Sequence, residues 1–283
     1  MANTRELRRR IKSVKNTAQI TKAMQMVAVT KMRRAQNQAT SGRPYSENLK
    51  VSLGRLLPRI DMSAHPLLVG NDSKNSAVIL LSTDKGLVGA LNTNLIRTVV
   101  SQNLGGSVFF YTVGRKGRSF VVRTNKDLKA DFENLDTVTF RQAKQLSKLL
   151  IDSFKLEEIG EVYLIYPQFI STLRQEPRKL KLLPIELAHL GGENGAESSE
   201  FLFEPDPDAL LDYLLVHHVQ EQIYQALLET KASEHSARMV AMKNATDNAL
   251  ELVEDLRLTY NQTRQANITT ELLEITTAQV AMQ

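Results

Sequence analysis

The chain has 283 residues, of which 42% are hydrophobic, so it can bury a substantial core in one or two domains. It contains no cysteine, which excludes disulfides, thiol catalysis and cysteine-ligated metal sites. The net charge of +5 is unevenly distributed, because residues 1–43 carry eleven basic residues and one acid (11 − 1 = +10), whereas residues 208–283 carry five basic residues and eleven acids (5 − 11 = −6).

The first predicted element is a long helix that begins at about Thr4. Apolar residues recur in it at alternating spacings of four and three, which is the heptad pattern of a coiled coil. The pattern comprises Leu7, Ile11, Val14, Ala18, Ala28, Met32, Ala35 and Ala39, with Thr21 and Gln25 at the two steps between Ala18 and Ala28. This face is therefore expected to pack against a partner helix.

Two features predict irregularity in this helix. A second apolar stripe lies beside the first, at Ile20, Met24 and Val27. It predicts that the packed face drifts around the helix. Gly42 and Pro44 weaken the helical pattern, but the pattern resumes over residues 45–57. We therefore expect either a kink or a helix that runs through to Pro58, and the continuous helix is favoured.

The central part of the chain has a different pattern. Residues 61–75 are rich in Pro, Gly, Asn, Asp and Ser, which indicates a linker, and residues 191–199 indicate a flexible loop. Strands are expected at residues 77–81, 107–113, 161–166 and 179–185, with an edge strand at Phe120–Arg123, and helices at residues 90–104 and 139–154. This alternation predicts a mostly parallel sheet with helices packed against it.

The tail, residues 208–283, contains no glycine or proline, and we expect it to form one unbroken helix about 110 Å long. No stretch in it approaches the roughly 20 apolar residues that span a bilayer, so a coiled coil is the favoured interpretation. Its apolar seam is expected at Val219, Ile223, Ala226, Ala237, Val240, Leu252 and Leu256. Polar residues fall on or beside this stripe at Ser233, Asn244 and Asn248.

These elements predict a Rossmann-like α/β domain combined with a long antiparallel coiled coil. The expected domains are an N-terminal helix over residues 1–60, the α/β domain over 61–204 and a C-terminal helix over 205–283. Opposite charge favours pairing of the two helices, although each exposed ion pair contributes only about 0.2–1 kcal/mol. Because the last helix is the longer one, its C-terminal tip is expected to project without a partner.

Motifs of enzyme chemistry are missing. No phosphate-binding loop is present, and GRKGRSF, which begins at Gly114, lacks the glycine spacing and the following helix that such a site needs. Asp84-Lys85-Gly86 follows a strand, where α/β proteins often bind ligands, but a plain turn is the favoured interpretation. The five histidines show no metal-binding spacing. We therefore predict no active site, metal site or cofactor in this chain.

The basic first helix raises the question of nucleic-acid binding, since Arg8–Arg10 and Arg33-Arg34 could neutralise phosphates. Against this interpretation, no aromatic residue occurs before Tyr45, and the acidic tail competes for the same charges. A solvated or protein-binding face is favoured, and no nucleic-acid partner is expected.

The chain resembles the gamma subunit of F-type ATP synthase. Residues 5–36, RELRRRIKSVKNTAQITKAMQMVAVTKMRRAQ, are similar to that family's opening helix. The family's terminal signature is similar to Arg264-Gln265-Ala266-Asn267-Ile268-Thr269 with Glu271, Glu274 and Ile275, and its first strand-turn-helix to Asp84-Lys85-Gly86-Leu87 with Asn92. The chain departs from the family pattern at Ala278-Gln279, where a Gly-Ala pair is usual, and at Gly89-Ala90, where Gly-Gly is common.

The resemblance implies a rotor shaft that couples proton-driven rotation of a membrane ring to conformational cycling of a catalytic ring. The implied partners are three alpha and three beta subunits, an epsilon subunit and the membrane c-ring, and the chain would meet the membrane only through the complex. The residues implied to contact the ring are Lys22, Met24, Arg33, Arg264, Gln265, Thr269 and Glu271.

The implied location is the cytoplasmic face of a bacterial inner membrane, with the matrix side of the mitochondrial inner membrane as the alternative. A coiled-coil scaffold or adaptor with an α/β head is the alternative function. A scaffold would self-associate through its helices, whereas a shaft would be present as one copy in a larger complex.

Overall fold

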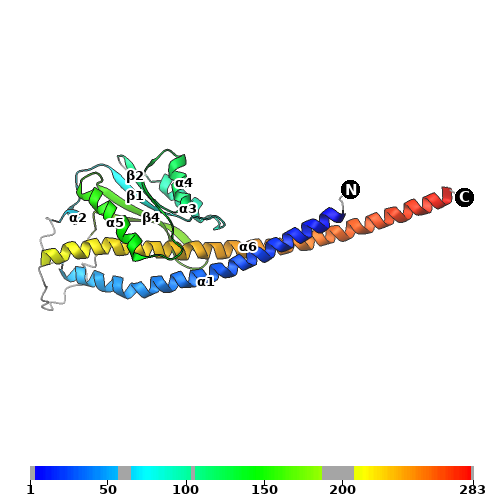
Figure 1. Cartoon of the computed structure of the whole chain (residues 1–283), viewed down its shortest axis with the longest axis horizontal. Helices are drawn as coiled ribbons and strands as arrows, with labels where there is room; N and C mark the ends of the chain where they lie inside the picture. Colours follow the sequence, from blue (N-terminus) through cyan, green and yellow to red (C-terminus); the bar gives the residue numbers. More distant parts are fainter. Residues whose placement is uncertain (1–3, 57–64, 103–105, 187–206, 282–283) are drawn as a thin grey trace. The chain divides into compact units, whose positions relative to one another are not determined.

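The structure, a computed structural model, describes residues 4–56, 65–102, 106–186 and 207–281. The chain forms two compact units: a coil unit of Met1–Val29 with Arg238–Gln283, and an α/β unit of Thr30–Ala237. Two long helices, α1 (Thr4–Leu56) and α6 (Pro207–Ala281), contribute residues to both units (Figure 1). The domain boundaries expected at residues 60 and 204, and the loop expected at 191–199, lie outside the described residues.

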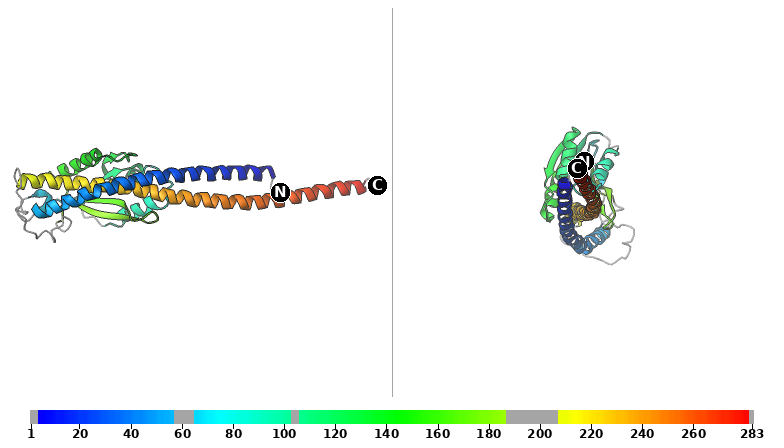
Figure 2. Two further views of the ribbon diagram at one scale, coloured as in Figure 1. Left: turned by 90° about the horizontal axis from the view of Figure 1, so that it is seen from below. Right: turned by 90° about the vertical axis from the view of Figure 1, so that its right-hand side faces the viewer.

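In the coil unit, α1 and α6 run antiparallel and side by side (Figures 1 and 2). The Thr21 and Thr246 hydroxyls are 2.7 Å apart, and the Arg8 guanidinium donates a hydrogen bond of 2.9 Å to the Tyr260 hydroxyl. The α1 residues from Leu7 to Ala28 that the heptad pattern selected are all buried or half-buried, Thr21 and Gln25 included. The predicted seam on α1 is therefore confirmed in this unit.

Two details of the coiled-coil prediction were wrong. Ile20 and Val27 are exposed, so the packed face does not drift towards them. On α6 the seam continues from Met242 through Thr246, Ala249, Val253 and Leu256 to Tyr260. Leu252 is exposed, and Val253 takes its place, because only Val253 continues the four-three spacing from Ala249. Asn244 and Asn248 are also exposed, and Thr246 is the polar residue in this seam.

In the α/β unit, α1 continues through Gly42 and Pro44, as predicted. This stretch is held against α6: the Tyr45 hydroxyl is 2.6 Å from His217 Nε2, and Ser46 Oγ donates to Glu221 Oε2 at 3.0 Å. Both contacts are made by the residues that directly follow Pro44, which has no backbone N–H to donate within the helix.

The α/β unit contains a five-stranded sheet with the order β3-β2-β1-β4-β5. Its strands are β1 (Ser76–Leu81), β2 (Val108–Val113), β3 (Asp127–Phe132), β4 (Glu161–Phe169) and β5 (Gln175–Leu183). The first four are parallel, and β5 pairs antiparallel with β4. All six residues of β1 are buried, as expected for a central strand covered on both faces.

The sheet is covered on both faces by helices (Figure 1). The shorter helices are α2 (Pro66–Val69), α3 (Leu91–Val100), α4 (Arg115–Arg123) and α5 (Phe140–Lys155). Leu80 and Phe110 pack against α3 and α4 on one face. On the other face, Ile79 and Leu164 belong to a larger core with α5, α1 and α6. The predicted class, a mostly parallel sheet between helices, is confirmed.

Two elements between residues 114 and 132 differ from the prediction. Phe120–Arg123, expected as an edge strand, is the last turn of α4, and Val121 is buried there against the sheet. The actual edge strand, β3, was not predicted. Its sequence DLKADF alternates exposed charged residues with half-buried apolar ones, which is the period-two pattern of an edge strand.

The buried side chain of Tyr166 is expected to make the stability of the fold depend on pH. Burial, followed by the negative charge of Glu229, raises the pKa of the Tyr166 phenol from 10.0 to about 12. Because the pKa of Tyr166 is higher in the folded state than in the unfolded state, the folded state favours the protonated phenol. The resulting contribution to the free energy of unfolding is complete below pH 10 and is lost as the pH rises towards 12.

We expect Tyr166→Phe to remove this pH dependence, about 2 kcal/mol of the free energy of unfolding between pH 9 and 12. Urea denaturation of the purified chain and of the variant across that range would measure the difference. Parallel pH profiles for the two proteins would contradict the assignment.

Candidate functional site

The edge of the sheet where α/β proteins usually bind ligands is filled by the chain itself. In the order β3-β2-β1-β4-β5, the connections diverge between β1 and β4, so the carboxyl ends of these strands flank the usual ligand crevice. Here α6 crosses that edge. Ser233 Oγ donates to the Pro167 carbonyl of β4 at 2.8 Å, and Asn134, which contacts Glu234, donates to the Ser82 carbonyl after β1.

The Asp84-Lys85-Gly86 turn is also closed to ligands. Asp84 Oδ1 accepts the Arg115 N–H at 2.9 Å, the Thr83 carbonyl accepts Lys116 N–H at 3.0 Å, and Ser82 Oγ accepts Gly117 N–H at 2.8 Å. A helix does follow Gly114, contrary to the sequence prediction. The free amides that make a helix start attractive to phosphate are, however, already bonded within the chain.

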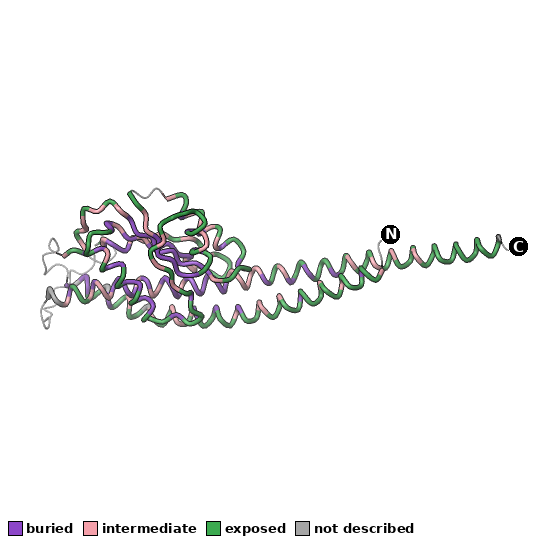
Figure 3. Tube along the Cα trace, turned by 45° about the horizontal axis from the view of Figure 1, so that its top comes forward, coloured by how far each residue is buried: buried purple, intermediate pink, exposed green. Residues whose placement is uncertain are grey.

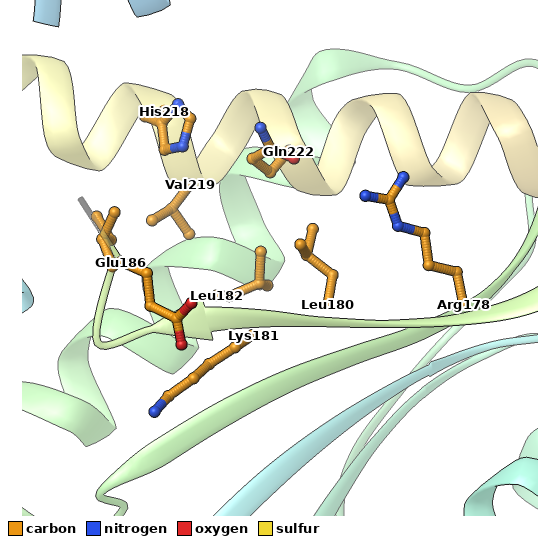
Figure 4. Close-up of a pocket in the computed structure, with 9 residues that line it drawn as sticks. Arg178, Leu180, Lys181, Leu182, Glu186, His218, Val219 and Gln222 are labelled. Carbon is orange, nitrogen blue, oxygen red and sulfur yellow. The ribbon is translucent and has the colours of Figure 1, made fainter. Parts of the chain in front are cut away.

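A small cavity between β5 and α6 has a volume of about 90 Å³ (Figure 4). Arg178, Glu186, His218 and Gln222 are among its lining residues. Its volume is well below the roughly 300–1,000 Å³ of typical small-molecule sites. His217 lies on another side of α6, beside Tyr45 and Phe140, so the two adjacent histidines point to different faces, as predicted.

Metal sites and membrane spans are two other common kinds of functional feature. Within ranges 4–56, 65–102, 106–186 and 207–281, no group of His, Asp and Glu side chains is arranged to hold a metal ion. No helix in these same ranges has an apolar run long enough to cross a bilayer. The surface of the coil unit is a further candidate.

The C-terminal tip of α6 is the most exposed part of the coil unit. Within this unit, α6 extends beyond the first described turn of α1, and every residue from Ile268 to Val280 is exposed (Figure 3). Ile268, Leu272 and Ile275 follow the spacing of an apolar helix face, yet no partner helix covers them in the described chain. An unpartnered apolar stripe of this kind indicates a protein-binding surface.

The predicted contact residues on the tip lie together. Arg264, Gln265, Thr269 and Glu271 are all exposed, and the Thr269 hydroxyl bonds only to the Gln265 carbonyl one turn earlier. Their side chains are thus available to a partner. The apolar stripe beside them was not among the predicted contacts, although its heptad spacing is readable in the sequence.

The predicted contact residues on α1 form a separate group. Lys22 is exposed and Met24 is half-buried in the coil unit, while Arg33 is exposed in the α/β unit. Since Thr21 lies opposite Thr246, the tip residues begin at Arg264, about 27 Å along α6 from the level of Thr21 and Lys22. The sequence prediction therefore corresponds to at least two distinct patches.

Several basic residues of α1 form no ion pair with the acidic tail in the described ranges, contrary to the expectation from charge alone. Among described residues, Arg9, Arg10, Lys12, Lys15 and Lys22 form no ion pair. Exposed apolar side chains, Ile20, Met26 and Val27, lie among these cations. A surface that combines unpaired cations with apolar groups is suited to an acidic protein partner.

Comparisons with known proteins agree with this arrangement. A family model described as ATP synthase matches residues 3–282. The chain is 44% identical to the ATP synthase gamma chain of Opitutus terrae over 99% of both chains, and 45% identical to that of Methylacidiphilum infernorum over the full length of both.

Solved structures show the same fold. A chain in the central stalk and c-ring structure of the Tetrahymena thermophila mitochondrial ATP synthase aligns with a TM-score of 0.61 at 26% identity, over 80% of this chain and 99% of that chain. A chain of the Euglena gracilis mitochondrial ATP synthase aligns with a TM-score of 0.68 at 20% identity, over 99% of this chain and 94% of that one. The scaffold alternative is not favoured by these matches. The chain therefore belongs to the ATP synthase gamma chain family, and its role is that of the rotor shaft of an F-type ATP synthase.

Proposed function

We propose that the shaft meets the catalytic ring through the exposed tip of α6 and through residues of α1. The observation that carries the proposal is the exposed end of α6, where the apolar stripe of Ile268, Leu272 and Ile275 has no partner in the described chain. Burying such a stripe contributes about 25 cal/mol of favourable free energy for each Å² of apolar surface removed from water. An apolar inner surface of the ring would therefore stabilise the inserted tip.

The first patch is the tip itself. Arg264, Gln265, Thr269 and Glu271 carry both charges and hydrogen-bonding groups on exposed turns beside the apolar stripe. We assign these four residues to contacts with the inner surface of the ring. The tip must rotate against the inner surface of the ring without binding tightly at one angle. An apolar stripe bordered by polar groups is suited to this.

The other proposed contacts are made by α1. Lys22 and Met24 in the coil unit, and Arg33 in the α/β unit, are assigned to contacts with the moving lever of the beta subunits. Lys22 and Arg33 are exposed cations without a described ion-pair partner, and they are suited to carboxylates on that lever.

Coupling follows from the asymmetry of the shaft. Its surface is cationic on one helix, acidic on the other and apolar at the tip, so a given angle presents a different surface to each of three equivalent catalytic sites. Each catalytic site has two conformations. The shaft can shift the equilibrium between them only by the difference between its binding free energies for the two. Rotation would thus drive each site through binding, reaction and release, while the catalytic groups belong to the ring.

The proposed complex contains one copy of this chain with three alpha and three beta subunits, an epsilon subunit and a membrane c-ring. It would lie on the cytoplasmic face of a bacterial inner membrane, since the relatives compared above at 44–45% identity are bacterial. The matrix side of a mitochondrial membrane is the alternative location.

Native mass spectrometry of the complex purified from gently solubilised membranes tests this composition. We expect one copy of this chain with three alpha and three beta subunits. Recovery of the chain as a homo-oligomer, without such a ring, would contradict the proposal and restore the scaffold hypothesis.

A further inference from the structure

A short stretch of α6 is buried on all sides although it is polar. Seven consecutive residues, Thr230–Ser236, are each at most 5% exposed, and six of the seven are polar or charged. Figure 3 shows α6 buried where it passes the sheet. A helix that is buried all round is ordinarily apolar, because an unbonded polar group in the interior is costly. We call Thr230–Ser236 the polar segment.

The charged residues of the polar segment are bonded to the end of the sheet. Lys231 Nζ donates to the Asn134 carbonyl at 3.2 Å and lies 3.5 Å from Glu234 Oε2. Asn134 Nδ2 in turn donates to Glu234 Oε2 at 3.3 Å and to the Ser82 carbonyl at 2.8 Å. One asparagine thereby connects α6 to the end of β1.

The two serines bond to β4 and to the turn that follows it. Ser233 Oγ donates to the Pro167 carbonyl in β4 at 2.8 Å, and Ser236 Oγ donates to the Thr172 carbonyl in the β4–β5 turn at 2.7 Å. Gln175 Nε2 also lies 3.3 Å from Ser236 Oγ. The polar segment is thus bonded at three separate places on the carboxyl edge of the sheet.

These bonds surround the helix axis. Successive helical residues are about 100° apart, so Ser233, Glu234 and Ser236 point about 200°, 300° and 140° from Lys231. Apolar packing has little directional preference, whereas hydrogen bonds weaken steeply when their angles change. A rotation or a slide of α6 by one residue would break several bonds at once and leave a buried charge unpaired.

Helix α1 is held from the same loop. Asp136, two residues after Asn134, lies 3.2 Å from Lys31, and the hydrogen bond from Lys31 lowers the pKa of the Asp136 carboxyl. The α/β unit ends at Ala237 on α6 and begins at Thr30 on α1, so both attachments lie close to where the helices leave it.

We propose that the polar segment and Asn134 are positioning residues that fix the rotational angle of α6 within the α/β unit, so that torque passes along the shaft without slip. This inference rests on the rotor-shaft role of the chain. Stability alone does not require these groups, because a buried ion pair can be replaced by well-packed apolar residues at little or no cost.

The test is an apolar variant, Lys231→Met/Ser233→Ala/Glu234→Met, assembled into the complete enzyme in liposomes. With the membrane potential collapsed by an uncoupler, ATP hydrolysis should match wild type. Against a proton gradient, protons pumped per ATP hydrolysed should fall about fivefold, because α6 slips under load. The matched control is Lys243→Met/Asp247→Met, which removes an exposed pair of the same charges outside the α/β unit.

A covalent bridge separates slip from a folding defect. The chain has no cysteine, so Thr172→Cys/Ser236→Cys, added to the apolar variant, can be joined by oxidation or by a short bifunctional thiol reagent. The bridge should restore pumping to within about twofold of wild type. A pumping ratio equal to wild type in the unbridged variant, or a loss that the bridge does not repair, would overturn the inference. A wild-type chain that does not assemble with a catalytic ring would instead contradict the proposed function.

Discussion

Replacing Met24 with lysine is expected to preserve assembly and ATP hydrolysis but to lower ATP-driven proton pumping about tenfold. Met24 is half-buried on α1, between exposed Ile20 and Val27. A lysine at this position keeps its stem against the coil and turns its ammonium group outwards, into the surface assigned to the beta subunits. An unmatched charge at an interface costs more than 1.4 kcal/mol, which corresponds to the tenfold change.

The measurement compares ATP hydrolysis with ATP-driven acidification of inverted membrane vesicles. Gln19→Lys is the matched control, because Gln19 is exposed on the same helix and the substitution adds the same charge. Met24→Leu, which keeps an apolar side chain of similar volume, should pump normally. Normal pumping by Met24→Lys, or an equal loss in Gln19→Lys, would remove Met24 from the coupling surface.

The long helices could be predicted because their signals are local. The absence of glycine and proline over residues 208–283 indicated α6, and the heptad pattern gave its antiparallel partner on α1. The choice between Leu252 and Val253 depends on the heptad register and not on the size of the side chain. Leucine is the larger apolar residue, but the register set by neighbours such as Thr246 and Ala249 places Val253 in the seam and Leu252 in solvent.

The polar segment could not be recognised from the sequence. TKASEHS resembles the solvated face of a helix, and Ser233 was identified only as a polar residue on or beside the expected seam. Its burial depends on carbonyls at Ser82, Pro167 and Thr172, which are distant in the sequence and come together only when the sheet forms. The tip was easier, because its exposure follows from the different lengths of the two helices.

The short elements around Gly114 show tertiary packing overriding local propensity. Phe120, Val121 and Val122 favour strand formation when considered alone. In the structure, the amides at the start of α4 bond to Asp84, Thr83 and Ser82, so the helix is nucleated by the end of β1. Those bonds require the backbone at Gly114 to approach β1 closely.

Gly114→Ala is therefore expected to destabilise the α/β unit by about 3 kcal/mol or more. Gly114 has φ 98° and ψ 143°, a conformation reached almost only by glycine, and a Cβ atom there would lie 2.3 Å from the Ser82 carbonyl oxygen. The oxygen belongs to the backbone, and the Cβ is held rigidly by the Cα of residue 114, so relief requires the end of β1 to move away from α4. That movement would also disturb the Ser82 carbonyl that Asn134 uses to hold α6.

Alanine substitutions at two other glycines distinguish the cost of backbone strain from the cost of a close contact. Gly89 has φ +58° with nothing within 4 Å of an added Cβ, so Gly89→Ala should cost only about 1 kcal/mol. Gly86 has an ordinary φ and equally open surroundings, so Gly86→Ala should be close to neutral. Urea denaturation of the three purified variants gives the order directly. If Gly114→Ala cost no more than Gly89→Ala, the strand end would be free to yield, and the attachment of α6 to it could not resist torque.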